Sequence, residues 1–354
     1  MSAVMNPVLA ADLEIILQRT PEVWRELRGA SIFMTGGTGW LGRTLIESVA
    51  YANRVADAKI SITLLTRSPQ NFAAEAPHLG SDPRIRLHQG DVKDFIFPEG
   101  QFSHVIHGAA TSATETFSGH APMEKFETLY FGTQRVLEFC KQSGARHLLF
   151  TSSGVAYGTP SDDAPIPEEY AGAPDTCDLN TALGQGKRAA EFLCSAYGAD
   201  GKTNVTIARC FSFVGPFMPL TLHYALGNFI NSALEGNPII IKGDGSPRRS
   251  YMYTADMASW ILTLLIRSGN PRIFNVGSSD AITIKELAKL VMAVVTPKLE
   301  LIVLGQTEHS IGNPNRNNYV PSILRANREQ RLEIWTQLET AVEKTVAFFR
   351  TTKI

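Results

Sequence analysis

The hydrophobic positions along this chain alternate between two periodicities. Short apolar runs, each the length of a buried strand, occupy residues 30–35, 60–66, 85–90, 104–109 and 147–153. Stretches with helical spacing separate them, and the longest covers residues 123–142. Strands that alternate with helices predict a parallel, doubly wound sheet, so the expected fold class is α/β.

A different pattern begins after about residue 211, where proline-rich turns come first. The elements predicted there are helices near 223–235, 282–294 and 337–350, strands at 238–243 and 299–304, and a polar loop at 305–320. Helical spacing also marks residues 7–28, ahead of the first strand. We interpret the early segment as a helical lead-in and the late one as a smaller lobe packed on the ends of the sheet.

The composition narrows the range of functions. With 44% hydrophobic residues, 19% charged residues and a net charge of −1, the chain gives no reason to expect nucleic acid or a membrane surface as a partner. Its four cysteines form no CxxC pair and have no histidines at ligand spacing, so we expect reduced thiols and no metal site. No run of about 18 apolar residues is present, and acidic residues stand where a signal peptide is basic, so we expect a cytoplasmic protein.

A glycine-rich segment joins the first predicted strand to a predicted helix. Gly36, Gly39 and Gly42 have the spacing GxxGxxG in the sequence GGTGWLG. Because these residues lack Cβ atoms, backbone N–H groups at a helix N-terminus can approach a pyrophosphate closely. The position between strand and helix therefore predicts a dinucleotide cofactor. The other residues of the segment expected to contact it are Thr38, Trp40 and Leu41.

The end of the next predicted strand bears on the choice between NADP and NAD. An NAD site usually has an acidic residue there for the ribose 2′-hydroxyl, whereas this strand ends in Thr66, Arg67 and Ser68. A guanidinium beside two hydroxyls suits a 2′-phosphate, so NADP is favoured over NAD. The alternative is that Arg67 is a solvated loop arginine.

Several short segments, taken together and in order, are specific for one superfamily. They are TGGTGWLG (35–42), QGDV (89–92), HGAA (107–110), SSGVAYG (152–158), KRAAE (187–191), RCFSFVGP (209–216), GDGSPRRSYMYTADMA (243–258) and FNVGSSDAITIKEL (274–287). With them the chain resembles the extended short-chain dehydrogenase/reductase superfamily, in its nucleotide-sugar epimerase/dehydratase branch. The resemblance extends from about residue 28 to 350.

The resemblance implies a division of the chain into parts. Residues 1–28 form a helical N-terminal extension, and residues 29–211 form a Rossmann-type NAD(P)-binding domain, to which residues 254–280 return. Residues 212–253 and 281–354 form a smaller C-terminal lobe that binds a nucleotide-diphosphate sugar.

The resemblance also assigns cofactor contacts to individual residues. Asp91 and Val92 match residues that hold the adenine ring, with a simple turn-forming role as the alternative for Asp91. Ala109 and Ala110 match residues that line the ribose and nicotinamide side. Lys187 matches the lysine of the YxxxK motif, which binds the nicotinamide ribose and counts among the catalytic residues.

Substrate contacts follow from the same resemblance. Ser153 matches the catalytic Ser/Thr that hydrogen-bonds the reacting sugar oxygen. Arg249, in GDGxxxR, matches an arginine that grips the substrate diphosphate, with a surface arginine on a turn as the alternative. Arg316 is the candidate for a second such arginine, and Thr111 and Asn228 complete the expected substrate contacts.

One position departs from the family pattern. The tyrosine of YxxxK is replaced by Leu183, which cannot carry the proton that accompanies hydride transfer. General acid–base catalysis is typically worth about 10²–10⁴-fold, so the replacement has a large expected effect. Three explanations stay open. Leu183 is an engineered change, or the proton is carried by another side chain or by water, or the protein binds dinucleotide or nucleotide sugar without turnover. Cys177 and Asp178 are candidates by sequence proximity, whereas Tyr157 is expected to be structural.

The helix that carries Lys187 has further unusual features. Gly184 and Gly186 each cost about 1 kcal/mol relative to alanine in a helix interior. By resemblance, we expect them to let the helix approach cofactor and substrate. The helices at 123–142 and 181–199 correspond to those that form a four-helix dimer interface in relatives, so we also expect a homodimer.

The residues after Ser153 bear on the reaction. Family 4,6-dehydratases place an Asp-Glu pair there and uronate decarboxylases usually keep the glutamate, whereas this chain has Gly154 and Val155. Both reactions are therefore disfavoured, which leaves 4-epimerisation or reduction of a 4-keto sugar, and an NADP site favours the reductase. A dinucleotide or nucleotide-sugar sensor and a reductase of steroid- or flavonoid-like substrates stay open as alternatives.

Overall fold

The computed structural model describes residues 5–110, 121–160, 162–222, 224–267, 272–305 and 318–352. Its centre is a sheet of seven parallel strands in the order β11-β6-β5-β4-β1-β2-β3. The strands are β1 (Ser31–Thr35), β2 (Ser61–Thr66), β3 (Ile85–Gln89), β4 (His104–His107), β5 (His147–Ser153), β6 (Asn204–Cys210) and β11 (Arg272–Val276). The order reverses beside β1, as in the Rossmann fold, which confirms the expected α/β class.

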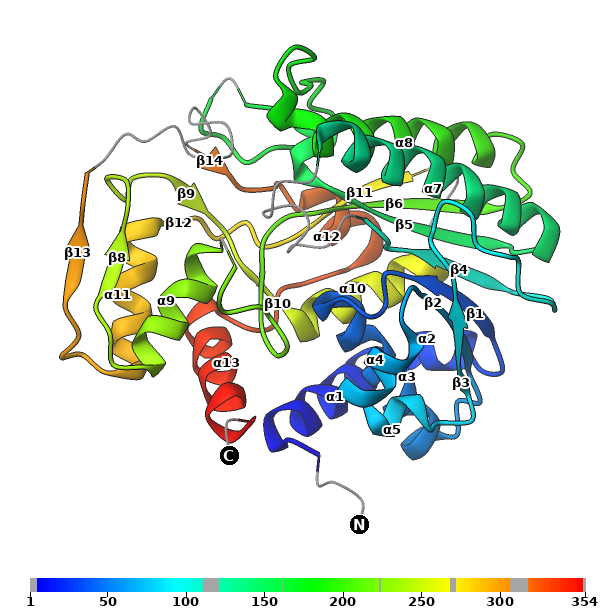
Figure 1. The fold of residues 1–354 in the computed structure, drawn as a ribbon, viewed down its shortest axis with the longest axis horizontal. Coiled ribbons are helices and arrows are strands. Elements are labelled where there is room, and N and C mark those ends of the chain that lie inside the picture. The colour runs from blue at the N-terminus through cyan, green and yellow to red at the C-terminus, as the bar shows by residue number, and fades with distance from the viewer. Residues whose placement is uncertain are drawn as a thin grey trace.

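Helices cover both faces of this sheet (Figure 1). One face carries α7 (Pro122–Ser143) and α8 (Ala182–Gly198), and the other carries α3 (Trp40–Ala56) and α10 (Thr254–Arg267). Each face has its own apolar cluster, and neighbouring residues of β1 point into different ones, Ile32 on the α3 side and Phe33 on the α7 side. The strands are thus buried on both sides, which explains why they are continuous apolar runs in the sequence.

Short elements beside the sheet make up most of the C-terminal part (Figure 1). The strand groups are β8 (Ile239–Ile241) with β13 (Leu301–Val303), β7 (Phe213–Val214) with β10 (Met252–Tyr253), and β9 (Arg248–Arg249) between β12 (Ile282–Thr283) and β14 (Asn318–Tyr319). The helices are α9 (Ala225–Leu234), α11 (Ile284–Val295), α12 (Leu324–Gln330) and α13 (Leu338–Thr352).

The predicted N-terminal helical segment is two helices, α1 (Pro7–Arg19) and α2 (Pro21–Glu26). Pro21 lacks an N–H and begins the second helix, so one continuous helix cannot form. The buried Asp12 of α1 accepts hydrogen bonds from Tyr253 Oη at 2.5 Å and Lys344 Nζ at 2.6 Å. Burial raises the pKa of this carboxyl, while the two hydrogen bonds act in the opposite direction. They tie the N-terminal helices to β10 and α13.

The five strands predicted before residue 154 agree with β1 to β5 to within two residues. Two short helices, α4 (Pro69–Glu75) and α5 (Pro77–Gly80), were not predicted, because each begins with a proline typical of loops. The polar loop at 305–320 ends in β14. The division into extension, cofactor domain and lobe stays a prediction. Within the described ranges, no helix is both long and apolar enough to cross a membrane.

Candidate active site

The turn between β1 and α3 packs directly against the end of β4. Gly36 has a φ of +75°, and a Cβ at this position would lie 2.4 Å from the Gly108 carbonyl carbon. A Cβ at Gly42 would lie 2.5 Å from the Gly36 carbonyl oxygen. Gly39 is the N-cap of α3 and has no side chain to cap the first N–H groups of the helix. The turn therefore presents backbone N–H groups in the way that an anionic ligand requires.

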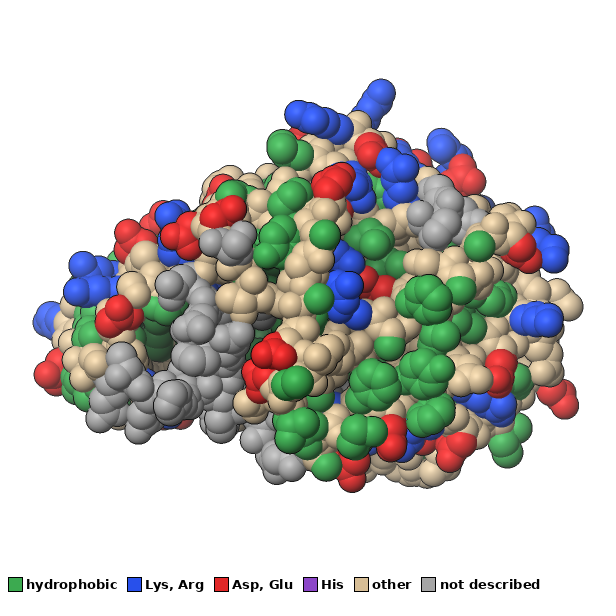
Figure 2. Space-filling model, turned by 90° about the horizontal axis from the view of Figure 1, so that it is seen from above, with side chains coloured by type: hydrophobic (Ala, Val, Ile, Leu, Met, Phe, Trp, Pro, Cys, Tyr) green, Lys and Arg blue, Asp and Glu red, His purple; other side chains and the backbone are tan. Residues whose placement is uncertain are grey.

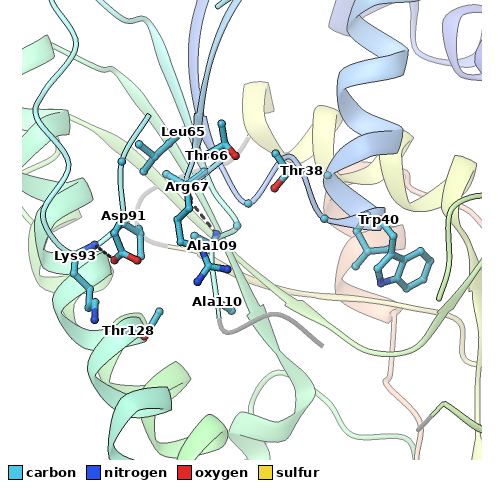
Figure 3. A pocket seen from close by; sticks show the side chains of 18 of the residues that line it. Thr38, Trp40, Leu65, Thr66, Arg67, Asp91, Lys93, Ala109, Ala110 and Thr128 are labelled. Carbon is cyan, nitrogen blue, oxygen red and sulfur yellow. Dashed lines mark hydrogen bonds between the residues drawn. The ribbon is translucent and has the colours of Figure 1, made fainter. Parts of the chain in front are cut away.

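A cavity of about 570 Å³ opens beside this turn, along the carboxyl ends of β1, β2, β3 and β4 (Figure 3). All the cofactor residues predicted from the sequence line it, with the exception of Lys187. They are Gly36, Thr38, Gly39, Trp40, Leu41, Gly42, Arg67, Asp91, Val92, Ala109 and Ala110. The structure thus brings together residues from four separate segments of the sequence.

The other lining residues are outside the predicted set of cofactor contacts, apart from Thr66, whose hydroxyl was expected beside Arg67. Those that belong to or border the matched segments are Thr35, Leu65, Thr66, Gly90, Lys93 and Gly108, and those from elsewhere are Glu124, Thr128 and Tyr224. The first set lies beside the matched motifs in the sequence, so it could have been predicted from them. The second set comes from α7 and the residue before α9, which only the three-dimensional fold brings to the cavity, so the sequence carries no signal for it.

Asp91 and Trp40 lie at opposite ends of the cavity (Figure 3). Asp91 Oδ1 accepts a hydrogen bond from Lys93 N at 3.0 Å, and the Asp91 carbonyl accepts one from Phe95 N at 2.9 Å. Asp91 therefore forms a turn, as the alternative interpretation required, and also lines the cavity. Val92 packs against Gly132 of α7, where a Cβ would lie 2.9 Å from Val92 Cγ1.

Arg67 is exposed and borders two hollows. Besides the main cavity it lines a smaller one of about 230 Å³, which Ser68 and Glu75 also line. The backbone N–H of Ser68 donates to Thr66 Oγ1 at 3.3 Å, which shapes the turn after β2. A guanidinium and a serine hydroxyl suit a phosphate, whereas the Glu75 carboxylate opposes one. The choice between NADP and NAD stays a prediction.

A buried histidine fixes the end of β4 beside the cavity. His107 lies between two hydroxyls, with Nδ1 2.8 Å from Thr35 Oγ1 and Nε2 3.0 Å from Thr133 Oγ1. Burial lowers the pKa of His107 to about 3, so the ring is neutral at ordinary pH. Thr35 Oγ1 also accepts a hydrogen bond from Ala109 N at 3.1 Å. We infer that His107 positions the cavity wall and takes no part in proton transfer.

The two predicted catalytic residues lie near the carboxyl end of β5. Lys187 is buried on α8, and its Nζ donates to the Thr151 carbonyl oxygen at 2.6 Å. Burial lowers the pKa of Lys187 to about 8. Ser153 Oγ accepts a hydrogen bond from Val155 N at 3.3 Å and lies 3.5 Å from the Tyr319 hydroxyl oxygen. Neither Ser153 nor Lys187 is among the residues that line the described cavity.

The two glycines of α8 pack closely against other parts of the protein. A Cβ at Gly184 would lie 2.8 Å from the Val155 carbonyl oxygen, and one at Gly186 would lie 2.7 Å from Leu129 Cδ1 on α7. They therefore allow α8 to approach α7 and the turn after β5. Their expected approach to cofactor and substrate stays a prediction.

A buried ion pair lies behind the end of β5. Glu191 accepts a hydrogen bond from Ser152 Oγ at 2.5 Å and pairs with Arg209 Nη2 at 2.6 Å. The Arg209 guanidinium lies 4.3 Å from the centroid of the Tyr157 ring, and Tyr157 Oη donates to Asn275 Oδ1 at 2.8 Å. Burial raises the pKa of Tyr157 to about 12. The phenol is fully buried and engaged, which agrees with a structural role.

The predicted substrate residues are not gathered around the described cavity. Asn228 is exposed on α9, and Arg249 on β9 donates from Nη1 to the Arg248 carbonyl oxygen at 2.7 Å. Thr111 and Arg316 lie outside the described residues. The substrate roles of these residues stay predictions. Within the described part of the chain, no cluster of three His, Cys, Asp or Glu side chains is arranged to hold a metal ion.

Comparison with known proteins assigns this arrangement to a family. The model of the NAD dependent epimerase/dehydratase family matches residues 32–277. The chain belongs to this family. The match spans the glycine turn, the cavity and the end of β5, and it confirms the resemblance drawn from the sequence segments.

Several relatives are named for an enzymatic activity. UDP-glucuronic acid decarboxylase 1 of Arabidopsis thaliana is 28% identical over 90% of this chain and 69% of its own length. UDP-glucuronic acid decarboxylase 3 of the same plant is 29% identical over 78% of each chain. These relatives carry the name of a reaction that the sequence analysis disfavours.

Solved structures share the fold. UDP-glucose 4-epimerase of Thermotoga maritima superimposes with a TM-score of 0.75 at 20% identity, covering 92% of this chain and 100% of the other. The dTDP-glucose 4,6-dehydratase DesIV of Streptomyces venezuelae gives a TM-score of 0.76 at 20% identity, covering 91% and 98%.

Gly36 offers a test of the packing that shapes the cavity. Gly36→Ala puts a Cβ 2.4 Å from Gly108, whereas Gly29 has a similar φ of +72° and nothing within 4 Å of its Cβ position. Both substitutions carry the strain of a left-handed alanine, but only the first adds overpacking, which costs about 1–3 kcal/mol. We expect Gly36→Ala to lower the free energy of unfolding by that much more than Gly29→Ala, as measured by chemical denaturation. Equal losses would contradict the packing argument.

Proposed function

We propose that this protein binds NADP and transfers hydride at C4 of a sugar carried on a nucleotide diphosphate. The proposed reaction is the reduction of a 4-keto sugar. The alternative is 4-epimerisation, which uses the same hydride transfer at C4. Membership of the NAD dependent epimerase/dehydratase family and the cavity beside the glycine turn support the cofactor. Arg67 and Ser68 beside the smaller hollow support a 2′-phosphate and therefore NADP.

The residues present fit a dinucleotide. Gly36 and Gly42 form a turn that a Cβ would fill, so a pyrophosphate can approach the start of α3 closely. Asp91 and Val92 contact the adenine end of the cofactor, and Ala109 and Ala110 line its ribose and nicotinamide end. When bound, the cofactor supplies the hydride that C4 of the sugar receives.

The observation that carries the reaction type is the space around Gly154. A Cβ at this position would lie 2.7 Å from both Phe211 Cζ and the Tyr319 hydroxyl oxygen. An aspartate after Ser153 would therefore collide with two aromatic side chains. Elimination of water across C5 and C6 needs an acid and a base beside the Ser, which the sequence Gly154-Val155 does not supply. Hydride transfer with one proton needs neither residue.

The residues at the end of β5 have defined roles in this reaction. Ser153 Oγ donates a hydrogen bond to the C4 oxygen of the sugar, which orients the carbonyl. Lys187, whose pKa is lowered to about 8 by burial, is mostly protonated at neutral pH and donates to the nicotinamide ribose. Leu183 carries no proton, so the proton for the C4 oxygen comes from elsewhere.

A binding protein without turnover is the second candidate. Leu183 favours it, because this residue removes the proton donor of the family motif while the cofactor turn is intact. The decarboxylase relatives suggest a third activity, but at 28–29% identity they do not decide the reaction.

We also propose a homodimer formed through α7 and α8. Hydrophobic side chains gather over the face that these helices cover (Figure 2). The exposed apolar residues in or next to the two helices are Met123, Phe131, Leu179 and Phe192. Exposed aromatic side chains on one face are typical of an interface. The division into an N-terminal extension (1–28), a cofactor domain and a sugar-binding lobe is part of the same proposal.

The reaction is tested by three parallel assays on the purified protein. We expect NADPH absorbance to fall with nucleotide-linked 4-keto-6-deoxy sugars, because C4 then receives hydride. Release of CO₂ from UDP-glucuronic acid and formation of a keto product from dTDP-glucose should both be absent. CO₂ release would instead establish a decarboxylase. Binding of NADPH and nucleotide sugar without any turnover would favour the binding protein.

Cofactor preference is tested at Arg67. A charge-assisted hydrogen bond to a phosphate contributes about 1.5–3 kcal/mol, or roughly 10- to 100-fold in Kd. We expect Arg67→Asp to weaken NADPH binding by this factor relative to NADH in fluorescence titrations. Arg84→Asp, an exposed change just before β3, is the control and should leave both affinities unchanged. An unaltered preference in Arg67→Asp would mean that Arg67 is a solvated loop residue.

The dimer is tested at Phe192, whose side chain is 72% exposed. A glutamate at the centre of an apolar interface buries a charge, so Phe192→Glu should convert the dimer to a monomer in light scattering. Val55→Glu, on α3 at the other face of the sheet, should stay dimeric. A monomeric parent protein, or a dimer that Phe192→Glu does not affect, would rule out this interface.

A further inference from the structure

We propose that Tyr319 of β14 is the proton donor that replaces the missing tyrosine at position 183. This inference rests on the proposed function, since it names the group that protonates the C4 oxygen. The observation behind it is the contact at the end of β5, where the Tyr319 hydroxyl oxygen lies 3.5 Å from Ser153 Oγ. Ser153 is the residue that the family resemblance assigns to the same sugar oxygen.

The space for this phenol is created by Gly154. A Cβ there would lie 2.7 Å from the Tyr319 hydroxyl oxygen, so any other residue at 154 would displace the phenol from Ser153. The glycine that removes the acid of a dehydratase is therefore the residue that admits a tyrosine from the C-terminal part. A tyrosine supplied from β14 therefore accounts for both Gly154 and Leu183.

The Tyr319 ring is held on several sides. It packs on Phe211 with ring centroids 4.7 Å apart, and it is 8% exposed. Its neighbours in sequence are also fixed: Asn318 Nδ2 donates to the Asp163 carbonyl oxygen at 2.6 Å, and Ile166 N donates to the Val320 carbonyl oxygen at 2.9 Å. A proton donor held in this way needs no reorganisation during the reaction.

The other proton-bearing groups near the end of β5 fit the role less well. Tyr157 donates to Asn275 inside the core. Cys210 lies opposite Ser153 on β6, and burial raises the pKa of its thiol to about 12. Asp178, a candidate by sequence proximity, accepts hydrogen bonds from Asn180 instead. Cys177, the other such candidate, is exposed.

The step balances with the groups already named. Bound NADPH would give up a hydride by breaking a C–H bond of its nicotinamide and would be oxidised to NADP⁺. The hydride would form a new C–H bond at the C4 carbonyl carbon, and the C=O π electrons would move to the oxygen. The Tyr319 O–H bond breaks and its proton forms the new hydroxyl on C4. The phenolate that remains takes up a proton again before the next turnover. In the oxidative direction every transfer is reversed.

Tyr319→Phe tests this assignment while keeping the ring that packs on Phe211. We expect kcat with NADPH and a nucleotide-linked 4-keto-6-deoxy sugar to fall by about 10²–10⁴-fold with little change in KM. Adding Leu183→Tyr to Tyr319→Phe should restore part of the rate. Tyr170→Phe is the matched control from the same aromatic cluster and should keep the rate.

A second measurement is independent of turnover. In cofactor-free protein, a nucleotide-linked 4-keto sugar should perturb the ultraviolet absorbance of tyrosine in the parent protein and in Tyr170→Phe, but not in Tyr319→Phe. If the parent protein turns over and Tyr319→Phe keeps its rate, the assignment of Tyr319 is wrong and the proposed function stands. If the parent protein binds these sugars without turnover, the proposed function fails, and the catalytic role of Tyr319 fails with it.

Discussion

Lys187 Nζ donates to the Thr151 carbonyl oxygen at 2.6 Å, and α8 lies against α7 and the turn after β5 at Gly184 and Gly186, where a Cβ would collide with its neighbours. This close packing fixes the lysine at the end of β5. Burial lowers the pKa of Lys187 from 10.5 to about 8, so at neutral pH the folded protein bears a cost of about 3 kcal/mol for the protonated amine. That cost declines as the pH rises from about 8 towards 10.5.

The cavity and the end of β5 were accessible to sequence analysis to different degrees. The glycine turn, Arg67 and Asp91 follow strands directly, so their meeting at one edge of a parallel sheet follows from the order of the elements. Tyr319 comes from a two-residue strand in a segment predicted as a polar loop, and only tertiary pairing with β9 brings it to Ser153. The sequence marks Gly184 and Gly186 as unusual for a helix, but it does not show which residues of α7 and of the turn after β5 they contact.

The departures from the family pattern become consistent when they are considered together. Leu183 removes a phenol from α8, and Gly154 removes a side chain at the end of β5. The volume that Gly154 leaves is occupied by the Phe211 and Tyr319 rings. A site with one hydroxyl pair and no carboxylate after Ser153 suits hydride transfer with a single proton. Under the proposed function, Gly154 and Val155 disfavour elimination of water, and the reaction differs from the one named for the sequence relatives.

The most direct test of this account follows the hydride itself. The protein would be incubated with NADPH deuterated at the reactive nicotinamide position and a nucleotide-linked 4-keto-6-deoxy sugar, and the product would be examined by mass spectrometry and proton NMR. The account predicts a sugar that carries the deuterium at C4. A product without deuterium at C4, or one that has lost its carboxyl carbon when UDP-glucuronic acid is supplied, would contradict it.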